Sequence, residues 1–342
     1  MAQSPPHEEG IASCLDHQQV HEVGICVVLC EPSHSSIGSP YCCSSLLIGK
    51  ATVTPKIDVL VVLYNSGNFI QPLLESIRRI TTPVTLYFLD NASRDGTTDK
   101  LSAALQHVPF RTHFLRSLSN NGFARGINLL ARQGTAEFMF VLNPDTELEE
   151  GCLERLLNRA INDPAIGMCE ARQQPREHPK AYDPRTGETT WCTGAAVLLR
   201  RKAFEAVGGF DERIFFMYCE DVDLSWKLWL RGWKCIYVPD AIVRHYNQDI
   251  IPGKKRTVEN YFSFRNSLFL FYRFGSWKQR RVLYNFFASR FFCGNYSLRS
   301  KLLYTFAFVD HIRYIPYLLR TRNQWRVESH PWVRLEETSL AD

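Results

Sequence analysis

The 342-residue chain contains no apolar run of the roughly 18 to 20 residues that a membrane-spanning helix needs. Arg273, Arg290 and Arg299 interrupt its most apolar stretches, which lie near the C-terminus. The first ten residues, MAQSPPHEEG, also lack the basic start and apolar core of a signal peptide. From these absences we expect a cytoplasmic protein that does not span a bilayer.

The chain also lacks paired CxxC sequences, which would make zinc a strong assignment. Its 11 cysteines are scattered, and in a reducing compartment disulfides are not expected. Five of them lie in residues 1–55, among several histidines and without a sustained helical or strand period. We interpret residues 1–55 as an irregular extension of unknown role with incidental cysteines rather than a zinc module.

Charge and aromatic residues are unevenly distributed along the chain. Residues 251–342 carry 16 Lys and Arg against 6 Asp and Glu, a net charge of +10, whereas the rest of the chain carries −5. They also hold 21 of the 43 aromatic residues. We therefore predict a catalytic domain over residues 56–250, followed by a basic, aromatic and mainly helical region over 251–342.

From residue 57 onward, strand-length apolar runs alternate with helix-length amphipathic segments. We expect strands at residues 57–64, 84–90, 111–117 and 137–145, with helices between them, the first capped by Asn68. A second half should contain strands near 166–172 and 234–239, a strand turning into a short helix before Gly208, and a helix from EDVD to Gly232. The pattern predicts an α/β fold with a Rossmann-like, mostly parallel sheet flanked by helices.

Polar clusters follow three of the predicted strands: YNSGN, DNASRDG and NPDT. Ligands of such sheets bind beyond the carboxyl ends of the strands. We therefore expect Asn65, Asp90, Asn91 and Asp145 to share one rim, where a nucleotide would bind.

Asp145 is the best candidate for a metal ligand, because it follows a buried strand and Pro144 stiffens the turn. An ordinary Asx turn is the alternative for this position. In EDVD, like charges raise one another's pKa, which suits a general base, and we assign that role to Asp221. Helix capping is the alternative, and we assign capping or packing to Asp223.

Two further features contribute more weakly. His245 follows a strand and could contact a metal or diphosphate, although a lone histidine is more often structural. NNGFARGIN offers a helix N-terminus to a phosphate but lacks both the GxGxxG and the GxxxxGK[ST] spacing.

Together the clusters resemble family 2 glycosyltransferases, most closely the bacterial rhamnosyltransferase-like branch. The resemblance covers residues 57–273, including VVLYNSG, LDNASRDGT, FVLNPDTELEEG, MYCEDVDL and RGWKCIYVPDAIVRH. It implies a GT-A fold and an inverting transfer assisted by a divalent metal, Mg²⁺ or Mn²⁺, with Asp145 and His245 as metal contacts and Asp221 as the catalytic base. The nucleotide-sugar site would comprise Tyr64, Asn65, Asp90, Asn91, Asn121, Gly122, Asn143, Trp191, Gly194 and Glu220.

Two positions depart from the family pattern. Asn143 stands where a first carboxylate of a DxD motif is expected, and YNQDIIPGKKR follows His245 where a short Gly/Ser-rich stretch is expected. The resemblance suggests dTDP-L-rhamnose as donor, with UDP- or GDP-sugars as alternatives, and a saccharide or lipid-linked acceptor in cell-surface polysaccharide synthesis.

Basic residues interleaved with aromatics could bind nucleic acid, but they also suit a helix on an anionic membrane. We predict peripheral binding at the inner face of the cell membrane and no nucleic acid partner; burial against the catalytic domain or a second subunit of a homo-oligomer is the alternative. Two other functions remain open: a sugar nucleotidyltransferase, which would need a Gly-rich phosphate loop that residues 57–70 do not provide, and a catalytically silent membrane-associated scaffold.

Overall fold

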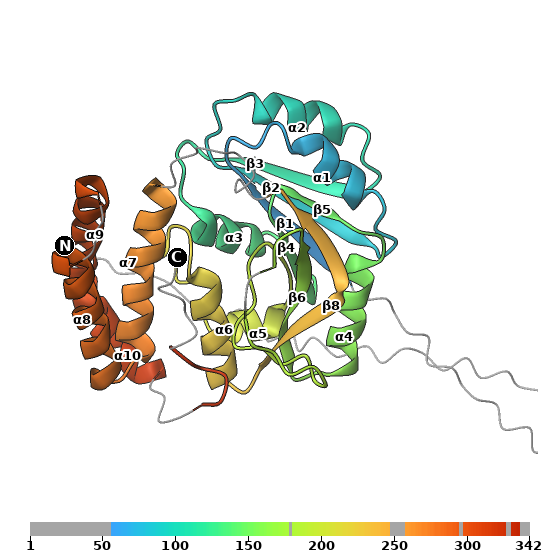
Figure 1. The fold of residues 1–342 in the computed structure, drawn as a ribbon. Coiled ribbons are helices and arrows are strands. Elements are labelled where there is room, and N and C mark those ends of the chain that lie inside the picture. Colours follow the sequence, from blue (N-terminus) through green and yellow to red (C-terminus); the bar gives the residue numbers. More distant parts are fainter. Residues whose placement is uncertain (1–55, 178–179, 247–256, 294–296, 326–329, 336–342) are drawn as a thin grey trace, which may run out of the picture. The chain divides into compact units, whose positions relative to one another are not determined.

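The computed structural model describes residues 56–177, 180–246, 257–293, 297–325 and 330–335 (Figure 1). All described residues belong to one compact unit, Thr52–Asp342. The predictions for the extension 1–55 and for the loop after Tyr246 lie outside the described residues.

One eight-stranded sheet forms the centre of this unit, in the order β3-β2-β1-β4-β7-β6-β8-β5. Its strands are β1 Ile57–Leu63, β2 Val84–Asp90, β3 Arg111–Arg116, β4 Phe138–Leu142, β5 Thr146–Leu148, β6 Ile166–Gln174, β7 Ala196–Arg200 and β8 Lys234–His245. Strands β1 to β4 are parallel to one another, and β6 is parallel to β8. Antiparallel pairing enters at β7, which lies between β4 and β6, and at the short edge strand β5.

Helices cover both faces of the sheet. They are α1 Ile70–Ile77, α2 Thr97–Leu105, α3 Phe123–Ala131, α4 Cys152–Asn162, α5 Arg201–Ala206, α6 Glu220–Leu230, α7 Thr257–Phe274, α8 Trp277–Cys293, α9 Leu298–Ile312 and α10 Ile315–Arg322. Strand β1 is buried on both faces, as its near-continuous β-branched run predicts. Helix α1 is confirmed but its cap is not: Phe69 precedes it without a side-chain cap, so the capping prediction for Asn68 is wrong.

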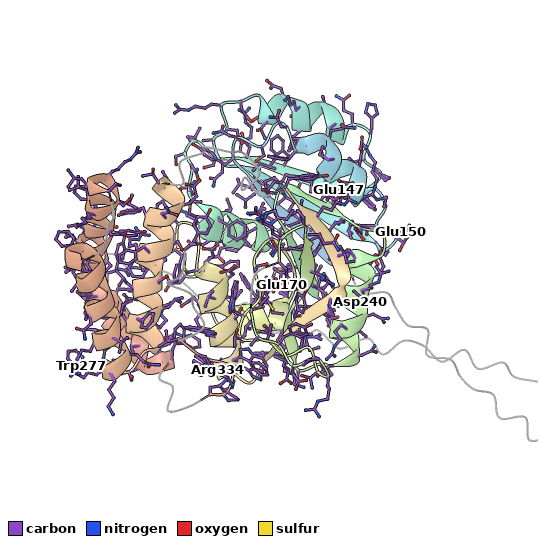
Figure 2. The ribbon with its side chains drawn as sticks, in the orientation of Figure 1. Glu147, Glu150, Glu170, Asp240, Trp277 and Arg334 are labelled. Atoms are coloured by element: carbon purple, nitrogen blue, oxygen red, sulfur yellow. The ribbon has the colours of Figure 1, made fainter. Side chains whose placement is uncertain are left out.

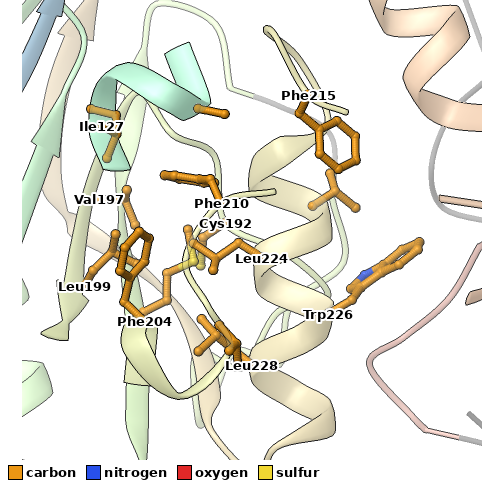
Figure 3. Close-up of a cluster of buried hydrophobic side chains, with 14 of the residues drawn as sticks. Ile127, Cys192, Val197, Leu199, Phe204, Phe210, Phe215, Leu224, Trp226 and Leu228 are labelled. Carbon is orange, nitrogen blue, oxygen red and sulfur yellow. The ribbon is translucent and has the colours of Figure 1, made fainter. Parts of the chain in front are cut away.

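Two hydrophobic clusters lie on opposite sides of the sheet, because alternate residues of a strand face opposite ways. In β1, Leu60 and Val62 belong to the cluster with α3, α6 and α7, whereas Val59, Val61 and Leu63 belong to the cluster with α1 and α4. Figure 3 shows the first cluster, in which aromatic side chains of the segment before α6 pack against α3, β7 and α6.

Helix α7 is part of this core rather than an appendage. Its second half, from Arg265 to Phe274, is buried, and its apolar residues share a cluster with α3 and α6. Arg273 forms ion pairs with Asp223 of α6 and with Asp211, and its side chain is 2% exposed. Part of the predicted C-terminal region therefore supports the helix that carries Asp221. The boundary at residues 250 and 251 stays a prediction.

Candidate active site

The rim at the carboxyl ends of β1 and β2 is built by loops that hydrogen-bond to each other. Asn65 has a left-handed backbone, with φ at 51°. Its N–H donates to the Ser93 hydroxyl at 2.9 Å, and its side-chain oxygen accepts from the Arg94 N–H at 2.9 Å. Tyr64 beside it is half exposed. The first two polar clusters thus meet, as the strand order predicts.

Asp90 and Asn91 are buried within this rim and have partners from the protein. Asp90 accepts from the Ser93 N–H at 3.1 Å and from the Thr98 hydroxyl at 2.6 Å. The Asn91 amide donates to the Gly122 carbonyl at 3.1 Å and accepts from the Asn121 N–H at 2.9 Å. Asn91 therefore fixes the start of α3 against the end of β2, and its contact with a nucleotide remains a prediction.

Gly122 is the point at which α3 meets the segment that leads to α6. Its φ is 83°, and a Cβ there would lie 2.3 Å from the Phe216 carbonyl oxygen. The next residue, Phe123, donates its N–H to that same oxygen at 2.7 Å. Only glycine permits this approach, because any other side chain would collide with backbone. The close packing against Phe216 therefore explains the glycine at position 122 of NNGFARGIN.

Asp145 and His245 lie together at the edge of the sheet. His245 ends β8 and pairs with Thr146 of β5, directly after Asp145. The His245 Nε2 atom is 3.3 Å from Asp145 Oδ1, and both side chains are largely buried. Asn143 of the same turn donates its N–H to the Ala195 carbonyl at 2.8 Å. The pairing of β5 with β8 therefore brings the two predicted metal contacts together, although 99 residues of sequence lie between them.

Asp221 lies in the first turn of α6, which directly follows a strained turn in the sequence. Tyr218 and Cys219 both have left-handed backbones, at φ values of 67° and 65°. The Asn266 amide of α7 donates to the Met217 and Tyr218 carbonyls at 2.8 and 2.7 Å, which holds this turn in place. Asp221 Oδ2 accepts from the Gly194 N–H at 3.1 Å. Two predicted site residues are thus in direct contact.

The three carboxylates of EDVD have different environments. Glu220 is buried, its Oε2 has no hydrogen-bond partner among the described residues, and burial followed by the nearby Asp221 charge raises its pKa well above the usual value. Burial would also raise the pKa of Asp223, but Arg273 and Lys227 outweigh burial and lower it. The packing role predicted for Asp223 agrees with these contacts.

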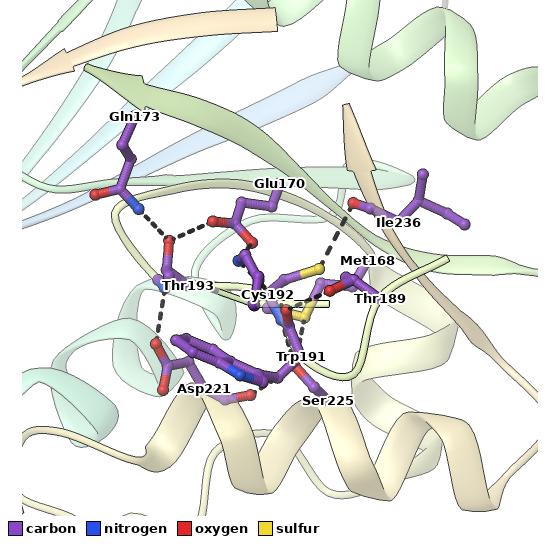
Figure 4. Close-up of polar contacts among 12 residues, drawn as sticks. Met168, Glu170, Gln173, Thr189, Trp191, Cys192, Thr193, Asp221, Ser225 and Ile236 are labelled. Atoms are coloured by element: carbon purple, nitrogen blue, oxygen red, sulfur yellow. Dashed lines mark hydrogen bonds and ion pairs between the residues drawn. The ribbon is translucent and has the colours of Figure 1, made fainter. Parts of the chain in front are cut away.

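A buried polar chain that the sequence interpretation missed connects His245 to the interior. Figure 4 shows its inner part, from Gln173 through Thr193 to Glu170. His245 Nδ1 is 2.7 Å from Gln173 Oε1, and the Gln173 amide donates to the Thr193 hydroxyl at 2.6 Å. Thr193 in turn donates to Glu170 at 2.9 Å, and Glu170 is ion-paired with Lys180. Glu170 stands in the apolar run IGMCEAR, and a charge at such a position is the signal that could have revealed the chain.

The segment Trp191–Ala195 therefore joins the separate parts of the candidate site. The Lys180 ammonium lies 4.6 Å from the centre of the Trp191 ring. Thr193 connects to His245, Gly194 contacts Asp221, and Ala195 contacts Asn143. A single backbone segment consequently sets the positions of the predicted base and of the predicted metal contacts.

Comparisons with known proteins agree with this geometry. The family Glycosyl transferase family 2 matches residues 58–221, and Glycosyl transferase family group 2 matches residues 180–319. An N-acetylglucosaminyl-diphospho-decaprenol L-rhamnosyltransferase of Mycobacterium tuberculosis is 32% identical, with 57% of this chain and 77% of the relative covered. The O-antigen chain rhamnosyltransferase RfbN of Salmonella typhimurium is 24% identical, with 56% and 66% covered.

Solved structures share the fold at low identity. A mannosyltransferase from Pyrobaculum calidifontis, in complex with GDP-Man and Mn²⁺, has a TM-score of 0.51 and 19% identity, with 80% of this chain and 74% of that chain covered. TarS 1–349 of S. aureus has a TM-score of 0.54 and 13% identity, with 78% and 83% covered.

Fold, site and relatives define a glycosyltransferase. The chain belongs to glycosyltransferase family 2, in its rhamnosyltransferase-like branch, and its sheet and helices form a GT-A fold. The predicted family, enzyme class and fold class are thereby confirmed. The roles of the individual site residues stay predictions.

Proposed function

We propose that this glycosyltransferase moves a sugar, with inversion, from a nucleotide diphosphate to a hydroxyl group of a saccharide or lipid-linked acceptor in cell-surface polysaccharide synthesis. The observation that carries the proposal is the junction at Trp191–Ala195, which holds Asp221 beside Gly194 and connects through Gln173 to the Asp145–His245 pair. A base and a pair of cation ligands, here connected through one backbone segment, are the groups that such a transfer needs.

Asp145 and His245 are suited to hold a divalent cation, Mg²⁺ or Mn²⁺. A carboxylate oxygen of Asp145 and the Nε2 atom of His245 face each other at 3.3 Å. Both atoms have a lone pair for a cation when the ring is neutral and its proton is on Nδ1. Among the described residues no cluster of three His, Cys, Asp or Glu side chains is present, so the diphosphate and water would complete the coordination. When bound, the cation would neutralise charge on the departing diphosphate.

Asp221 accepts the proton of the acceptor hydroxyl. The hydroxyl oxygen bonds to the anomeric carbon, the bond from that carbon to the diphosphate oxygen breaks, and the nucleoside diphosphate leaves with the electron pair. The raised pKa of Glu220 favours its neutral form and thereby reduces repulsion of an ionised Asp221. The Gly194 N–H holds one oxygen of Asp221, and the other accepts from the N–H of Val222.

The donor proposed first is dTDP-L-rhamnose, with UDP- and GDP-sugars as alternatives. Its support is the rhamnosyltransferase function named for the Mycobacterium tuberculosis and Salmonella typhimurium relatives. The nucleoside site would use Tyr64, Asn65, Asp90 and Asn91 at the ends of β1 and β2, where the exposed Tyr64 ring offers a surface for a base. The helix start at Asn121 and Gly122 would face the phosphates.

The acceptor is proposed to be carried by a lipid, which α8 and α9 would approach at the cytoplasmic face of the membrane. Among the described residues, no helix is long and apolar enough to cross a bilayer. Helix α9 instead exposes an apolar stripe with three- to four-residue spacing, consisting of Leu298, Leu302, Phe306, Val309 and Ile312. Residues 277–322 contain nine Lys and Arg and one acidic residue, Asp310, which pairs with Arg265. Apolar and basic residues together match an anionic membrane, whereas a second copy would present the same positive charge.

A thermal-shift panel tests the donor proposal. The wild-type protein is heated with dTDP-L-rhamnose, UDP-sugars or GDP-sugars, each with Mg²⁺, Mn²⁺ or EDTA. A ligand at 100 times its Kd stabilises the folded protein by about 2.7 kcal/mol, so the true donor should raise the Tm clearly. Stabilisation by dTDP-L-rhamnose with metal is the expected result. Stabilisation by only a UDP- or GDP-sugar would replace the donor, and no stabilisation by any nucleotide sugar would contradict the proposal.

A further inference from the structure

Three buried side chains connect the candidate metal ligand His245 to the Lys180 ammonium in the interior. Gln173, Thr193 and Glu170 are each at most 4% exposed, and Figure 4 shows their hydrogen bonds as a continuous chain. Water therefore has little access to the chain, and each donor in it must find its acceptor within the chain. The direction of every hydrogen bond is consequently linked to that of the next.

The ion pair at the inner end sets that direction. Glu170 faces the Lys180 ammonium and, as a carboxylate, offers only acceptors. Thr193 must therefore donate its hydroxyl proton to Glu170, at 2.9 Å, and can only accept from Gln173. The group of Gln173 that faces Thr193 is then its NH₂, and its carbonyl oxygen is the atom that faces His245.

The outer end follows from the same reasoning. Gln173 Oε1 can only accept, so His245 Nδ1, at 2.7 Å, carries the ring proton. The Nε2 lone pair of a neutral His245 then faces Asp145. We propose that Gln173, Thr193 and Glu170 are positioning residues that fix the Nδ1–H tautomer of His245 and thereby hold Nε2 ready for a divalent cation. This inference rests on the metal role proposed for Asp145 and His245.

The first measurement reads the tautomer without any metal or substrate. Long-range ¹H–¹⁵N spectra of histidine-labelled protein, at a pH where the shifts show a neutral ring, distinguish Nδ1–H from Nε2–H. Comparison with His245→Gln assigns the signal among the 10 histidines. The expected spectrum has the proton on Nδ1. A His245 ring protonated on Nε2 would overturn the inference, whatever the donor sugar proves to be.

The second measurement uses two matched substitutions and Mn²⁺ alone. Thr193→Val removes the hydroxyl that links Glu170 to Gln173, whereas Thr190→Val removes a hydroxyl that is equally buried and has no hydrogen-bond partner among the described residues. Outer partners of metal ligands typically change affinity about 10- to 100-fold. We expect Thr193→Val to weaken Mn²⁺ binding in that range, measured by the free Mn²⁺ electron paramagnetic resonance signal, and Thr190→Val to leave it unchanged.

Glu170→Gln tests the direction of the hydrogen bonds in the chain, whereas Thr193→Val removes one of them. Its amide can donate to Thr193, which would turn the Thr193 hydroxyl toward Gln173 and reverse the Gln173 amide. We expect the His245 proton to move to Nε2 in this variant and the affinity for Mn²⁺ to fall. An Nδ1–H ring in both Glu170→Gln and Thr193→Val would show that the chain does not set the tautomer. Absence of Mn²⁺ binding by wild-type protein would contradict the proposed metal role, and the spectra would still decide the inference.

Discussion

The backbone N–H of Gly194 donates a hydrogen bond to Asp221 Oδ2 over 3.1 Å. Because the donor belongs to the backbone, no substitution of a side chain removes it, and the carboxylate keeps one orientation relative to β7. Gly194 is followed by Ala195, whose carbonyl receives the N–H of Asn143. The turn that carries Asp145 and the helix that carries Asp221 are therefore both hydrogen-bonded to the same dipeptide, Gly194–Ala195.

Asp221→Asn should abolish transfer while donor binding persists. An asparagine oxygen can still accept from Gly194, but the amide cannot take a proton from the acceptor hydroxyl. General base catalysis contributes about 10²- to 10⁴-fold to a rate. The kcat should therefore fall at least about 10²-fold, with little change in the Kd for the donor. Asp240→Asn on the exposed surface of β8 is the control (Figure 2). Equal transfer by Asp221→Asn and wild type would end the base assignment.

Glu220→Gln should stabilise the protein increasingly as the pH rises. The pKa of Glu220 is raised in the folded state, so the folded protein binds more protons than the unfolded chain above the ordinary glutamate pKa of about 4.3. Wild-type stability attributable to this residue is therefore lost as the pH rises from there toward the folded pKa. Urea unfolding at several pH values should show no difference below about pH 4 and a growing advantage of Glu220→Gln above it. A pH-independent difference would contradict the raised pKa.

Arg273→Leu should destabilise the fold far more than Arg313→Leu. Arg273 is buried between Asp211 and Asp223, and removal of one partner from a buried ion pair costs about 3–5 kcal/mol. The Arg313 side chain is 72% exposed, and its pair with Asp310 at 3.2 Å should contribute at most about 1 kcal/mol. Chemical denaturation measures both. Similar losses for the two variants would mean that α7 is not anchored to α6 through Arg273.

Strands β1, β2 and β4 were predictable because each is a nearly continuous apolar run, and the meeting of the polar residues after β1 and β2 follows from the parallel order. The contact of Asp145 with His245 was implied only by the family resemblance, because the residue pattern does not reveal β5, a strand of three residues without a readable period. Composition predicts that residues 251–342 form a separate basic region. Composition carries no information about Arg273, whose partner Asp223 lies 50 residues earlier in the sequence.

Phe306→Asp should weaken binding to anionic vesicles. Phe306 is 65% exposed on the apolar stripe of α9, where a carboxylate would face the lipid acyl boundary. Ile161→Asp changes an apolar residue of α4 that is 47% exposed and serves as the matched control. In a flotation assay at low salt, wild type and Ile161→Asp should rise with the vesicles and Phe306→Asp should not. Wild-type protein that stays in the soluble fraction would contradict membrane binding, and a concentration-dependent dimer in sedimentation would then favour a second copy as occupant of the stripe.

The central claim is that Asp145, with His245, holds a cation that the donor needs, and calorimetric titration of the nucleotide sugar tests it most directly. dTDP-L-rhamnose is titrated into wild type, Asp145→Asn and the exposed control Glu150→Gln, each with Mn²⁺ and with EDTA. The account predicts tight binding to wild type and Glu150→Gln only when Mn²⁺ is present, and at least a tenfold weaker affinity for Asp145→Asn. Equal binding by all three proteins in EDTA would contradict it.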